Sequence, residues 1–228
     1  WVLAGDPLQL PPTVLSEKAK KEGFNISILE QGFKQCKSVY FLNTQYRMRK
    51  EIADFSSRYF YDKELLTPDS LGNLSDHILF YDTAGTGFDE QSGSDGSSLM
   101  NEGELSLVDK LIQKHELDES KTAFISPYAG QVLMAKGQLP EKLRISTIDS
   151  FQGQEKEFVI LSLVRSNSSA VIGFLNDYRR MNVAVTRAKE KLIVIGDSST
   201  IGKDAFYTKF LEYMDEVGGY HSAWELIE

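Results

Sequence analysis

Residues 158–164 read Phe-Val-Ile-Leu-Ser-Leu-Val, and residues 192–195 read Leu-Ile-Val-Ile. Apolar side chains occupy nearly every position of both runs, so each predicted strand would be covered on both faces rather than on one. This pattern is typical of central parallel strands that lie between two layers of helices. The two runs therefore predict an α/β fold with a mostly parallel sheet.

In both directions from these runs, short β-branched or aromatic stretches alternate with helical periodicity. The other predicted strands are residues 2–4, 38–42, 78–81, 122–126 and 143–147. The predicted helices are residues 26–33, 50–60, 102–115, 130–136, 178–188 and 203–217. This alternation indicates a doubly wound, three-layer domain. Because ligands of such domains bind outside the carboxyl ends of the strands, we expect the polar turns after the strands to form the site.

Length and composition fit one large domain with no membrane-spanning segment. The chain has 228 residues, of which 41% are hydrophobic, and no apolar run approaches the roughly 20 residues that a membrane helix needs. Cys36 is the single cysteine, which fits a reducing, cytoplasmic setting. The three histidines lie far apart without cysteine partners, so no metal site is expected. Since the chain begins with Trp1, we interpret it as a fragment of a longer protein.

The net charge of −8 is unevenly distributed along the chain. Residues 82–119 carry ten acids and two lysines, and residues 204–228 carry six acids and one lysine. The remaining residues, which hold all the polar motifs of the chain, have 22 basic and 17 acidic side chains, a net charge of +5. A local positive surface for phosphate groups is therefore compatible with the acidic average.

One segment interrupts the alternation of strands and helices. Residues 83–98 are rich in Gly, Ser, Asp and Thr, and Phe88 is their single large apolar residue. Such a composition buries too little to order itself, so we expect a flexible acidic loop near residues 83–100. Asn101 is then expected to cap a helix that starts near Glu102.

The segment Gly5-Asp6-Pro7-Leu8-Gln9-Leu10-Pro11-Pro12 comes after the first predicted strand. Its glycine permits a sharp exit from a strand, and its prolines stiffen the rest of the segment. A stiff loop can direct Gln9 at a fixed point, where the amide could bind a phosphate oxygen or orient a water molecule. An ordinary proline-rich turn would explain the same residues.

Two arginines lie beside predicted helices in polar contexts. Arg47 belongs to Gln45-Tyr46-Arg47-Met48, and Arg187 lies near the end of the predicted helix 178–188. A guanidinium presents permanently charged, forked donors that suit phosphate groups. Arg47 could equally form a surface ion pair, and Arg187 could be either an arginine finger or a solvated charge.

A further polar turn comes after the predicted strand 122–126. It reads Ser126-Pro127-Tyr128-Ala129-Gly130-Gln131 and leads into a helix. Ser126, Gln131 and the backbone amides at the helix N-terminus could bind a nucleic-acid phosphate. Tyr128 could stack on a base or pack against the protein. The alternative is that the segment simply caps the helix.

Residues 146–155 connect the predicted strand 143–147 to the central run 158–164 through a polar, glycine-containing loop. Thr147 and Ser150 could donate hydrogen bonds to phosphates. Gly153 allows the backbone to approach a ligand closely. Glu155 could accept hydrogen bonds from ribose hydroxyls.

Taken in order, these motifs closely resemble those of superfamily 1 helicases, in the branch that contains the nonsense-mediated-decay and immunoglobulin-mu-binding-protein helicases. The matching motifs are Gly-Asp-Pro-x-Gln-Leu-Pro-Pro, Gln-Tyr-Arg-Met, Ser-Pro-Tyr, Phe-Gln-Gly-x-Glu and Asn-Val-Ala-Val-Thr-Arg-Ala. The resemblance covers about residues 1–200. It implies a RecA-like domain of the P-loop NTPase type. Residues 1–35 would be the last part of a first motor domain, and residues 36–228 would be the second.

The resemblance also implies roles for individual residues. Gln9 matches a γ-phosphate sensor, Arg47 matches the arginine of the fourth helicase motif, and Arg187 matches an arginine finger. Nucleotide binding is further implied for Gly5, Asp6, Gln45, Tyr46, Gly153 and Glu155. Contact with single-stranded nucleic acid, either DNA or RNA, is implied for Ser126, Pro127, Tyr128, Gln131, Thr147 and Ser150.

The chain departs from the family pattern because it contains no Walker A or Walker B motif. In the family these motifs hold ATP and Mg²⁺, and the preceding RecA-like domain supplies them. We therefore expect this chain alone to hold neither ATP nor Mg²⁺ and to hydrolyse no ATP. Two alternatives remain: a non-catalytic module, derived from a helicase domain, that binds nucleic acid or protein, and a nucleotide-binding α/β domain of another NTPase class.

Overall fold

The computed structural model describes residues 2–12, 14–36, 38–71, 76–93, 96 and 98–227. Within this part of the chain, a six-stranded sheet has the order β5-β4-β6-β7-β1-β8, and each neighbouring pair is parallel. The strands are β1 (Ile78–Asp82), β4 (Thr122–Ser126), β5 (Arg144–Thr147), β6 (Lys156–Ser162), β7 (Ala188–Gly196) and β8 (Tyr220–Ser222). This confirms the predicted α/β class and its parallel sheet.

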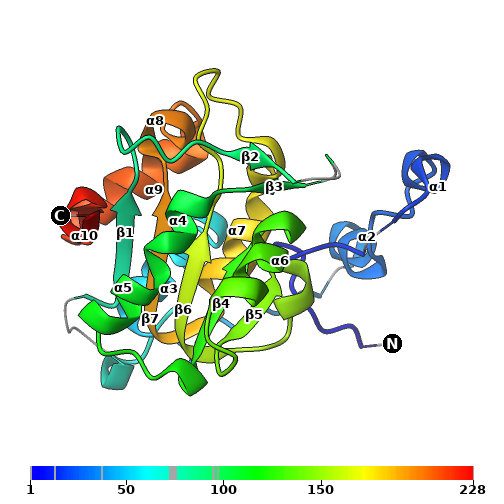
Figure 1. The fold of residues 1–228 in the computed structure, drawn as a ribbon. Helices are drawn as coiled ribbons and strands as arrows, with labels where there is room; N and C mark the ends of the chain where they lie inside the picture. Colours follow the sequence, from blue (N-terminus) through cyan, green and yellow to red (C-terminus); the bar gives the residue numbers. More distant parts are fainter. Residues whose placement is uncertain are drawn as a thin grey trace.

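Helices cover both faces of the sheet (Figure 1). One face packs against α3 (Lys50–Phe60), α7 (Tyr178–Val185), α8 (Ser198–Ile201) and α9 (Ala205–Glu216). The other packs against α4 (Glu102–Ser106), α5 (Val108–Lys114), α6 (Ala129–Gln138) and α10 (Trp224–Ile227). Successive side chains of a strand point to opposite faces, so the apolar runs in β6 and β7 contribute side chains to the hydrophobic cores on both faces of the sheet. The result is the expected three-layer arrangement.

An aromatic cluster fills the core between the sheet and the α3, α7 and α9 layer. Phe206 is fully buried there. Its ring meets Phe55 edge to face at a centroid distance of 5.6 Å and Tyr59 at 4.5 Å, and it stacks on Tyr178 at 4.6 Å. Because Tyr178 is the first residue of α7, this cluster fixes the start of the helix that leads to Arg187.

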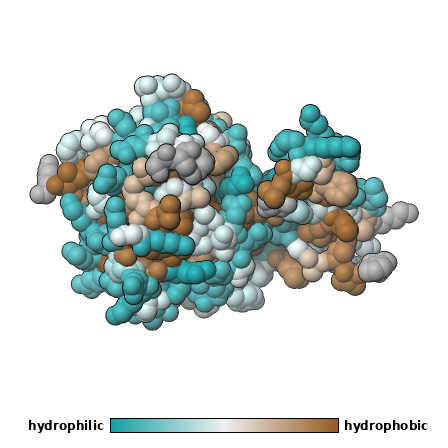
Figure 2. Space-filling model, turned by 45° about the vertical axis from the view of Figure 1, so that its right-hand side comes forward, coloured by the Kyte–Doolittle hydropathy of each residue, from teal (hydrophilic) through white to brown (hydrophobic). Residues whose placement is uncertain are grey.

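The N-terminal residues do not join the sheet. Residues 2–4 and 38–42, predicted as strands, have no ladder partner among the described residues, so both predictions are wrong. Helices α1 (Glu17–Lys21) and α2 (Ile28–Gln35) lie on an extension beside the main body (Figure 1). Apolar side chains of this extension are exposed and form brown patches among polar residues in Figure 2. They include Leu3, Leu15, Phe24, Ile28 and Phe33.

The segment near residues 83–100, predicted as a flexible acidic loop, contains ordered contacts among its described residues. Strands β2 (Gln91–Ser92) and β3 (Leu99–Met100) pair antiparallel. The Glu90 carboxylate accepts hydrogen bonds from Ser166 N at 2.9 Å and Asn167 Nδ2 at 3.1 Å, and pairs with Arg165 at 3.2 Å. The prediction overlooked this anchor because the partners of Glu90 lie more than 70 residues away in sequence.

The helix predicted at 102–115 is divided into α4 and α5 at Leu107. Asn101 caps α4 as predicted, because its side chain accepts from Glu104 N at 2.9 Å. Glu104 itself is fully buried beneath the sheet. Its Oε2 accepts from Ser162 Oγ at 2.6 Å and Val164 N at 3.0 Å, whereas Oε1 has no partner among the described residues. Burial raises the pKa of Glu104 to about 8.

Glu104→Gln is expected to flatten the pH dependence of stability. An unfolded glutamate ionises near pH 4.3. From there to about pH 8 the folded chain keeps a proton that the unfolded chain has released, so the free energy of unfolding falls as pH rises through this window. Glutamine keeps the shape and stays neutral, which removes a cost that reaches at most about 5 kcal/mol above pH 8. The pH dependence of stability is measured by thermal unfolding of both proteins between pH 5 and 9.

The matched control for this prediction is Glu102→Gln, which neutralises an exposed acid on the same short helix. Its Tm profile should run parallel to that of the wild type. Parallel profiles for wild type and Glu104→Gln would contradict a neutral, buried carboxyl.

Among the helices of the described residues, none combines the length and the apolar character that a membrane crossing requires.

Candidate functional site

Two predicted site residues meet at the amino edge of the sheet. Glu155 immediately precedes β6, and Arg187 immediately precedes β7. Since β6 and β7 are parallel neighbours, with Lys156 opposite Ala188, their starting points lie side by side. Lys156 N donates to Arg187 O at 3.1 Å, and this hydrogen bond joins the starts of the two strands. The expectation that all the polar turns gather at the carboxyl edge is therefore wrong for these two.

Arg47 reaches the same place from the turn before α3. Its Nε lies 2.5 Å from Glu155 Oε2, and its Nη1 donates to Thr186 O at 3.1 Å. Gln45 builds this turn, because its Oε1 accepts from Arg47 N at 2.9 Å and from Met48 N at 2.8 Å. Gln45 is thus a positioning residue, whereas the side chain of the neighbouring Tyr46 is 76% exposed.

Arg187 is buried, and its guanidinium faces inward. Nε donates to Val183 O at 2.9 Å, Nη1 to Gln154 O at 3.2 Å and Nη2 to Thr186 Oγ1 at 2.9 Å. A guanidinium has five N–H donors, so two remain unused by the described residues. Burial lowers the pKa of Arg187 to about 10, and the neighbouring charge of Arg47 contributes to the same shift. The side chain stays cationic at neutral pH.

Glu155 lies between two cations. Its Oε1 is 2.6 Å from Lys189 Nζ, while Oε2 contacts Arg47. The hydrogen bond from Lys189, together with the charge of Arg47, holds the pKa of Glu155 below its ordinary value. Close by, Arg49 pairs with Glu190 at 2.7 Å. The four cations Arg47, Arg49, Arg187 and Lys189 against the two carboxylates leave a local charge of +2, which suits a polyanion.

The segment around Gln9 is held against α7. Asn182 Nδ2 donates to Leu8 O and to Tyr61 Oη, both at 3.0 Å. Tyr61 Oη donates to Asp6 Oδ2 at 2.6 Å, and Gln9 Nε2 donates to the same atom at 2.9 Å. Burial and the bond to Asp6 raise the pKa of Tyr61. Gln9 therefore lies beside the helix that leads to Arg187, so the fold brings the three predicted catalytic side chains to one side of the domain.

Two predicted site glycines differ in their surroundings. Gly5 lies so close to α2 that a Cβ there would stand 2.8 Å from Leu29 Cδ2. Gly153 has a φ of +79°, a conformation that favours glycine, and open space around it. Gly153 is thus exposed in the loop that leads to Glu155, as a position for close backbone approach requires.

Three residues predicted to contact nucleic acid are buried, and this corrects the prediction for them. Gln131 is fully enclosed, accepts from Asn101 N at 2.7 Å, and donates to Asn101 O and Ser162 Oγ at 3.0 Å. Ser126 is also fully buried at the end of β4. Tyr128 stacks on Phe174 at 5.5 Å and is covered. These side chains support the loop instead of facing a ligand.

Thr147 and Ser150 remain accessible at the carboxyl end of β5. The Thr147 hydroxyl donates to Ser150 Oγ at 3.0 Å, and Ser150 N donates to Thr147 Oγ1 at 3.2 Å. Ser150 is exposed, and Thr147 and Pro127 are partly exposed. This edge lies opposite the cluster of Arg47, Arg49, Arg187 and Lys189, here called the arginine cluster, because parallel strands place their two ends at opposite edges of a sheet.

Sequence reasoning missed two residues that build the site. Tyr61 links the Gln9 segment to α7, and Lys189 completes the cationic cluster around Glu155. Tyr61 gave no signal, since it comes after a helix without a motif. Lys189 directly follows the Arg187-Ala188 pair of the matched motif, and this position beside the motif is the signal that could have found it.

The family comparison agrees with this architecture. Residues 24–199 match the family model described as an AAA domain. The chain therefore belongs to this family.

Its relatives include a DNA-binding protein, a DNA helicase and a regulator of nonsense transcripts. The chain is 37% identical to the DNA-binding protein SMUBP-2 of Mesocricetus auratus, over 100% of this chain and 25% of that protein. It is 36% identical to the DNA polymerase alpha-associated DNA helicase A of Saccharomyces cerevisiae, over 86% of this chain and 34% of that protein. It is 32% identical to the Regulator of nonsense transcripts 1 homolog of Arabidopsis thaliana, over 94% of this chain and 19% of that protein.

The chain thus spans between a fifth and about a third of the length of these relatives. The family match and these relatives confirm the resemblance to the C-terminal RecA-like half of superfamily 1 helicases, in the branch of the nonsense-mediated-decay and immunoglobulin-mu-binding-protein helicases.

Proposed function

We propose that this chain is the second motor domain of an ATP-dependent helicase or translocase that acts on single-stranded nucleic acid. The observation that carries the proposal is the meeting of two arginines beside Glu155 at one edge of the sheet. Arg47 pairs with the Glu155 carboxylate, and Arg187 donates to the backbone oxygen of the preceding Gln154. Gln9 approaches the same side through Asn182. Two guanidinium groups with an amide on the same side of the domain suit the phosphate groups that phosphoryl transfer must hold.

The donor set fits the terminal phosphates of a nucleotide. Arg187 keeps two unused N–H donors among the described residues, and Arg47 is only partly buried. These two side chains would bind phosphate oxygens, with Gln9 beside them and Gly153 and Glu155 near the sugar. Bound ATP would supply the free energy for movement. The Walker lysine and the Mg²⁺ ligands that the family resemblance implies would come from the first motor domain.

The exposed apolar side chains of the N-terminal extension support the assignment of residues 1–35 to the first motor domain. Leu3, Phe24 and Ile28 lie on the surface here, and large apolar patches mark contact surfaces. A cleft between two such domains would close when Arg47 and Arg187 bind phosphate. Closure and reopening would alternately tighten and loosen the contacts of Thr147 and Ser150 with one strand of nucleic acid.

The proposal is tested by ATP hydrolysis in the protein that contains this chain, assayed side by side with single-stranded DNA and RNA. Stimulation by either strand is expected, and the stronger stimulator identifies the substrate. No stimulation by either, with ATP bound, would contradict the proposal.

The 228-residue chain alone is expected to hydrolyse ATP no faster than the buffer background. Its arginines stabilise transferred charge only once metal and nucleotide are held, and the sequence contains no Walker motif to hold them. Phosphate release measured at high chain concentration checks this. ATP turnover by the chain that survives repeated purification would refute it.

The inward bonds of Arg187 favour one alternative, a non-catalytic module that binds nucleic acid or protein. In that case Arg187 would serve only to join α7 to β7. The same assay separates the two functions, because a non-catalytic module would bind strands without stimulating hydrolysis.

A further inference from the structure

A basic pocket lies at the β5 edge of the sheet. It adjoins the arginine cluster through Lys156, whose backbone N–H donates to Arg187 O. It has a volume of about 480 Å³ and is formed by the end of α6, the following loop and the first residues of β5 and β6. Four cationic side chains and one carboxylate line it. They are Lys136, Lys142, Arg144, Lys156 and Glu141. In a chain with a net charge of −8, such a local excess of positive charge calls for an anionic partner.

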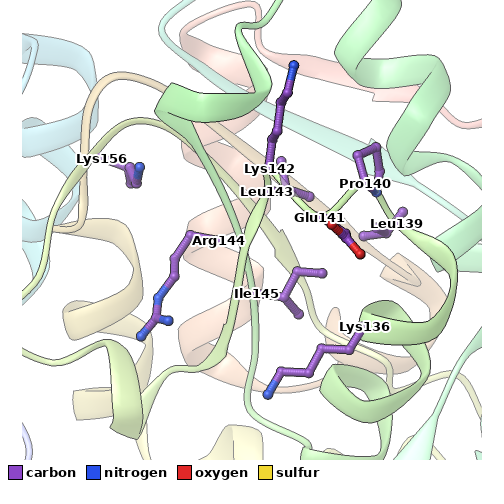
Figure 3. A pocket seen from close by; sticks show the side chains of 9 residues that line it. All are labelled: Lys136, Leu139, Pro140, Glu141, Lys142, Leu143, Arg144, Ile145 and Lys156. Carbon is purple, nitrogen blue, oxygen red and sulfur yellow. The ribbon is translucent and has the colours of Figure 1, made fainter.

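The arrangement of the cations suits an extended ligand. Figure 3 shows Lys136 and Arg144 reaching toward the same side, one on each side of Ile145, whereas Lys142 extends the opposite way. Lys136, Lys142 and Arg144 are exposed. A single small anion needs donors that converge on one point, but these charges are spread along a strip of the surface.

Among the described residues, the pocket cations form no ion pair, although Lys156 Nζ donates to Ser120 O at 2.7 Å. Among the described residues, Lys121 and Lys189 on neighbouring surfaces form ion pairs with Glu157 and Glu155. Neither Lys136 nor Arg144 forms an ion pair with any residue that the structure describes. Their charges are available to an incoming polyanion, which would release counterions on binding.

Strand β5 connects this pocket to the proposed nucleic-acid contacts. Arg144 is its first residue and Thr147 its last, and β5 is the edge strand of the sheet. At about 3.3 Å per residue, Thr147 lies roughly 10 Å from Arg144 along the strand. A strand of nucleic acid that passes Thr147 and Ser150 can therefore continue along the edge of the sheet into the pocket.

We propose that this pocket is a second contact for the phosphodiester backbone of the same single strand, beyond Thr147 and Ser150. Lys136 and Arg144 bind the phosphates, and the half-buried Ile145 between them offers an apolar surface to the sugar or base. This inference rests on the proposed nucleic-acid function and adds a site that is separate from Arg47 and Arg187.

The test compares Lys136→Ala/Arg144→Ala with wild type in the protein that contains this chain, without nucleotide. Affinity for a fluorescent single strand is measured against salt concentration. Loss of two phosphate contacts should weaken binding roughly three- to tenfold near 0.1 M salt and reduce the salt slope by about 1.4. In a series of strands of increasing length, the variant should match wild type for the shortest strands and fall behind once the strand reaches the pocket.

The matched control is Lys203→Ala/Lys209→Ala, which removes two exposed cations. Lys203 precedes α9, and Lys209 lies within it. This control should bind as wild type does. Thr147→Ala/Ser150→Ala should weaken binding at every strand length. Because all the altered side chains lie on the surface or close to it, thermal unfolding should confirm that each variant is folded.

The outcomes separate the two proposals. Unchanged binding by Lys136→Ala/Arg144→Ala, with weaker binding by Thr147→Ala/Ser150→Ala, would overturn the pocket and leave the function intact. The cations would then only protect the edge of β5 from pairing with another chain. Wild type that binds no strand would overturn both. Displacement of a labelled polyglutamate peptide, but not of a strand, would assign the pocket to an acidic protein partner and overturn the proposal.

Discussion

Replacing Arg187 by alanine in the protein that contains this chain is expected to lower kcat for strand-stimulated ATP hydrolysis by about 10³-fold or more. An arginine that stabilises the transferred phosphoryl group is worth about 10³–10⁵ in rate. The structure places this side chain beside Arg47 and Glu155, with two N–H donors unused by the described residues. Affinity for ATP should change far less than kcat, because the contact strengthens in the transition state.

A structural loss must be separated from the catalytic one, since Arg187 is buried and bonded to three partners. Thr186→Val is the matched control: it removes the hydroxyl that accepts from Arg187 Nη2 and keeps the guanidinium. Both variants should unfold at lower temperature, but only Arg187→Ala should lose hydrolysis at a temperature where it is folded. Hydrolysis that persists in folded Arg187→Ala would leave the residue with only its role in joining α7 to β7.

Phe206→Ala is expected to lower the free energy of unfolding by about 3–5 kcal/mol, the range for removing a buried aromatic ring. Phe206 is fully enclosed and contacts the rings of Phe55, Tyr59 and Tyr178. For a chain of this length, each kcal/mol shifts Tm by roughly 2–4 °C. Calorimetry or circular dichroism should therefore show a fall of at least about 6 °C.

The control for Phe206→Ala is Phe24→Ala, which truncates an aromatic side chain that is 67% exposed. Its unfolding should change by less than about 0.5 kcal/mol. Equal effects of the two substitutions would show that the aromatic cluster does not hold the core together. Since Phe206 also supports Tyr178 at the start of α7, the Phe206→Ala variant should hydrolyse ATP more slowly even where it is folded.

The central sheet could be predicted from sequence because its strands carry their own signal. The runs in β6 and β7 are apolar at nearly every position, a pattern that is typical of a strand covered on both faces. Residues 2–4 and 38–42 have a similar local composition but no partner strand among the described residues. Strand pairing is a non-local property, so short apolar runs alone predicted two strands too many.

Some residues of the candidate site could likewise be predicted from the sequence, and others could not. The meeting of Arg47 and Arg187 was expected from the family resemblance, whereas Gln131 looked equally polar and is buried. Its partners Asn101 and Ser162 lie 30 and 31 residues away, and nothing in the local sequence shows that they satisfy its amide. A polar residue at the end of a strand can face a ligand or complete a buried network, and long-range contacts decide between them.

The crossover from β5 to β6 has a mechanical consequence. Residues 148–154 are all that separates Thr147 at one end of the sheet from Glu155 at the other, and part of this link is coiled into the short helix η3 (Asp149–Phe151). Such a link has little slack. A displacement of Glu155 would be passed along the backbone to Ser150, so in the proposed function this short link couples the nucleotide site to the nucleic-acid contacts.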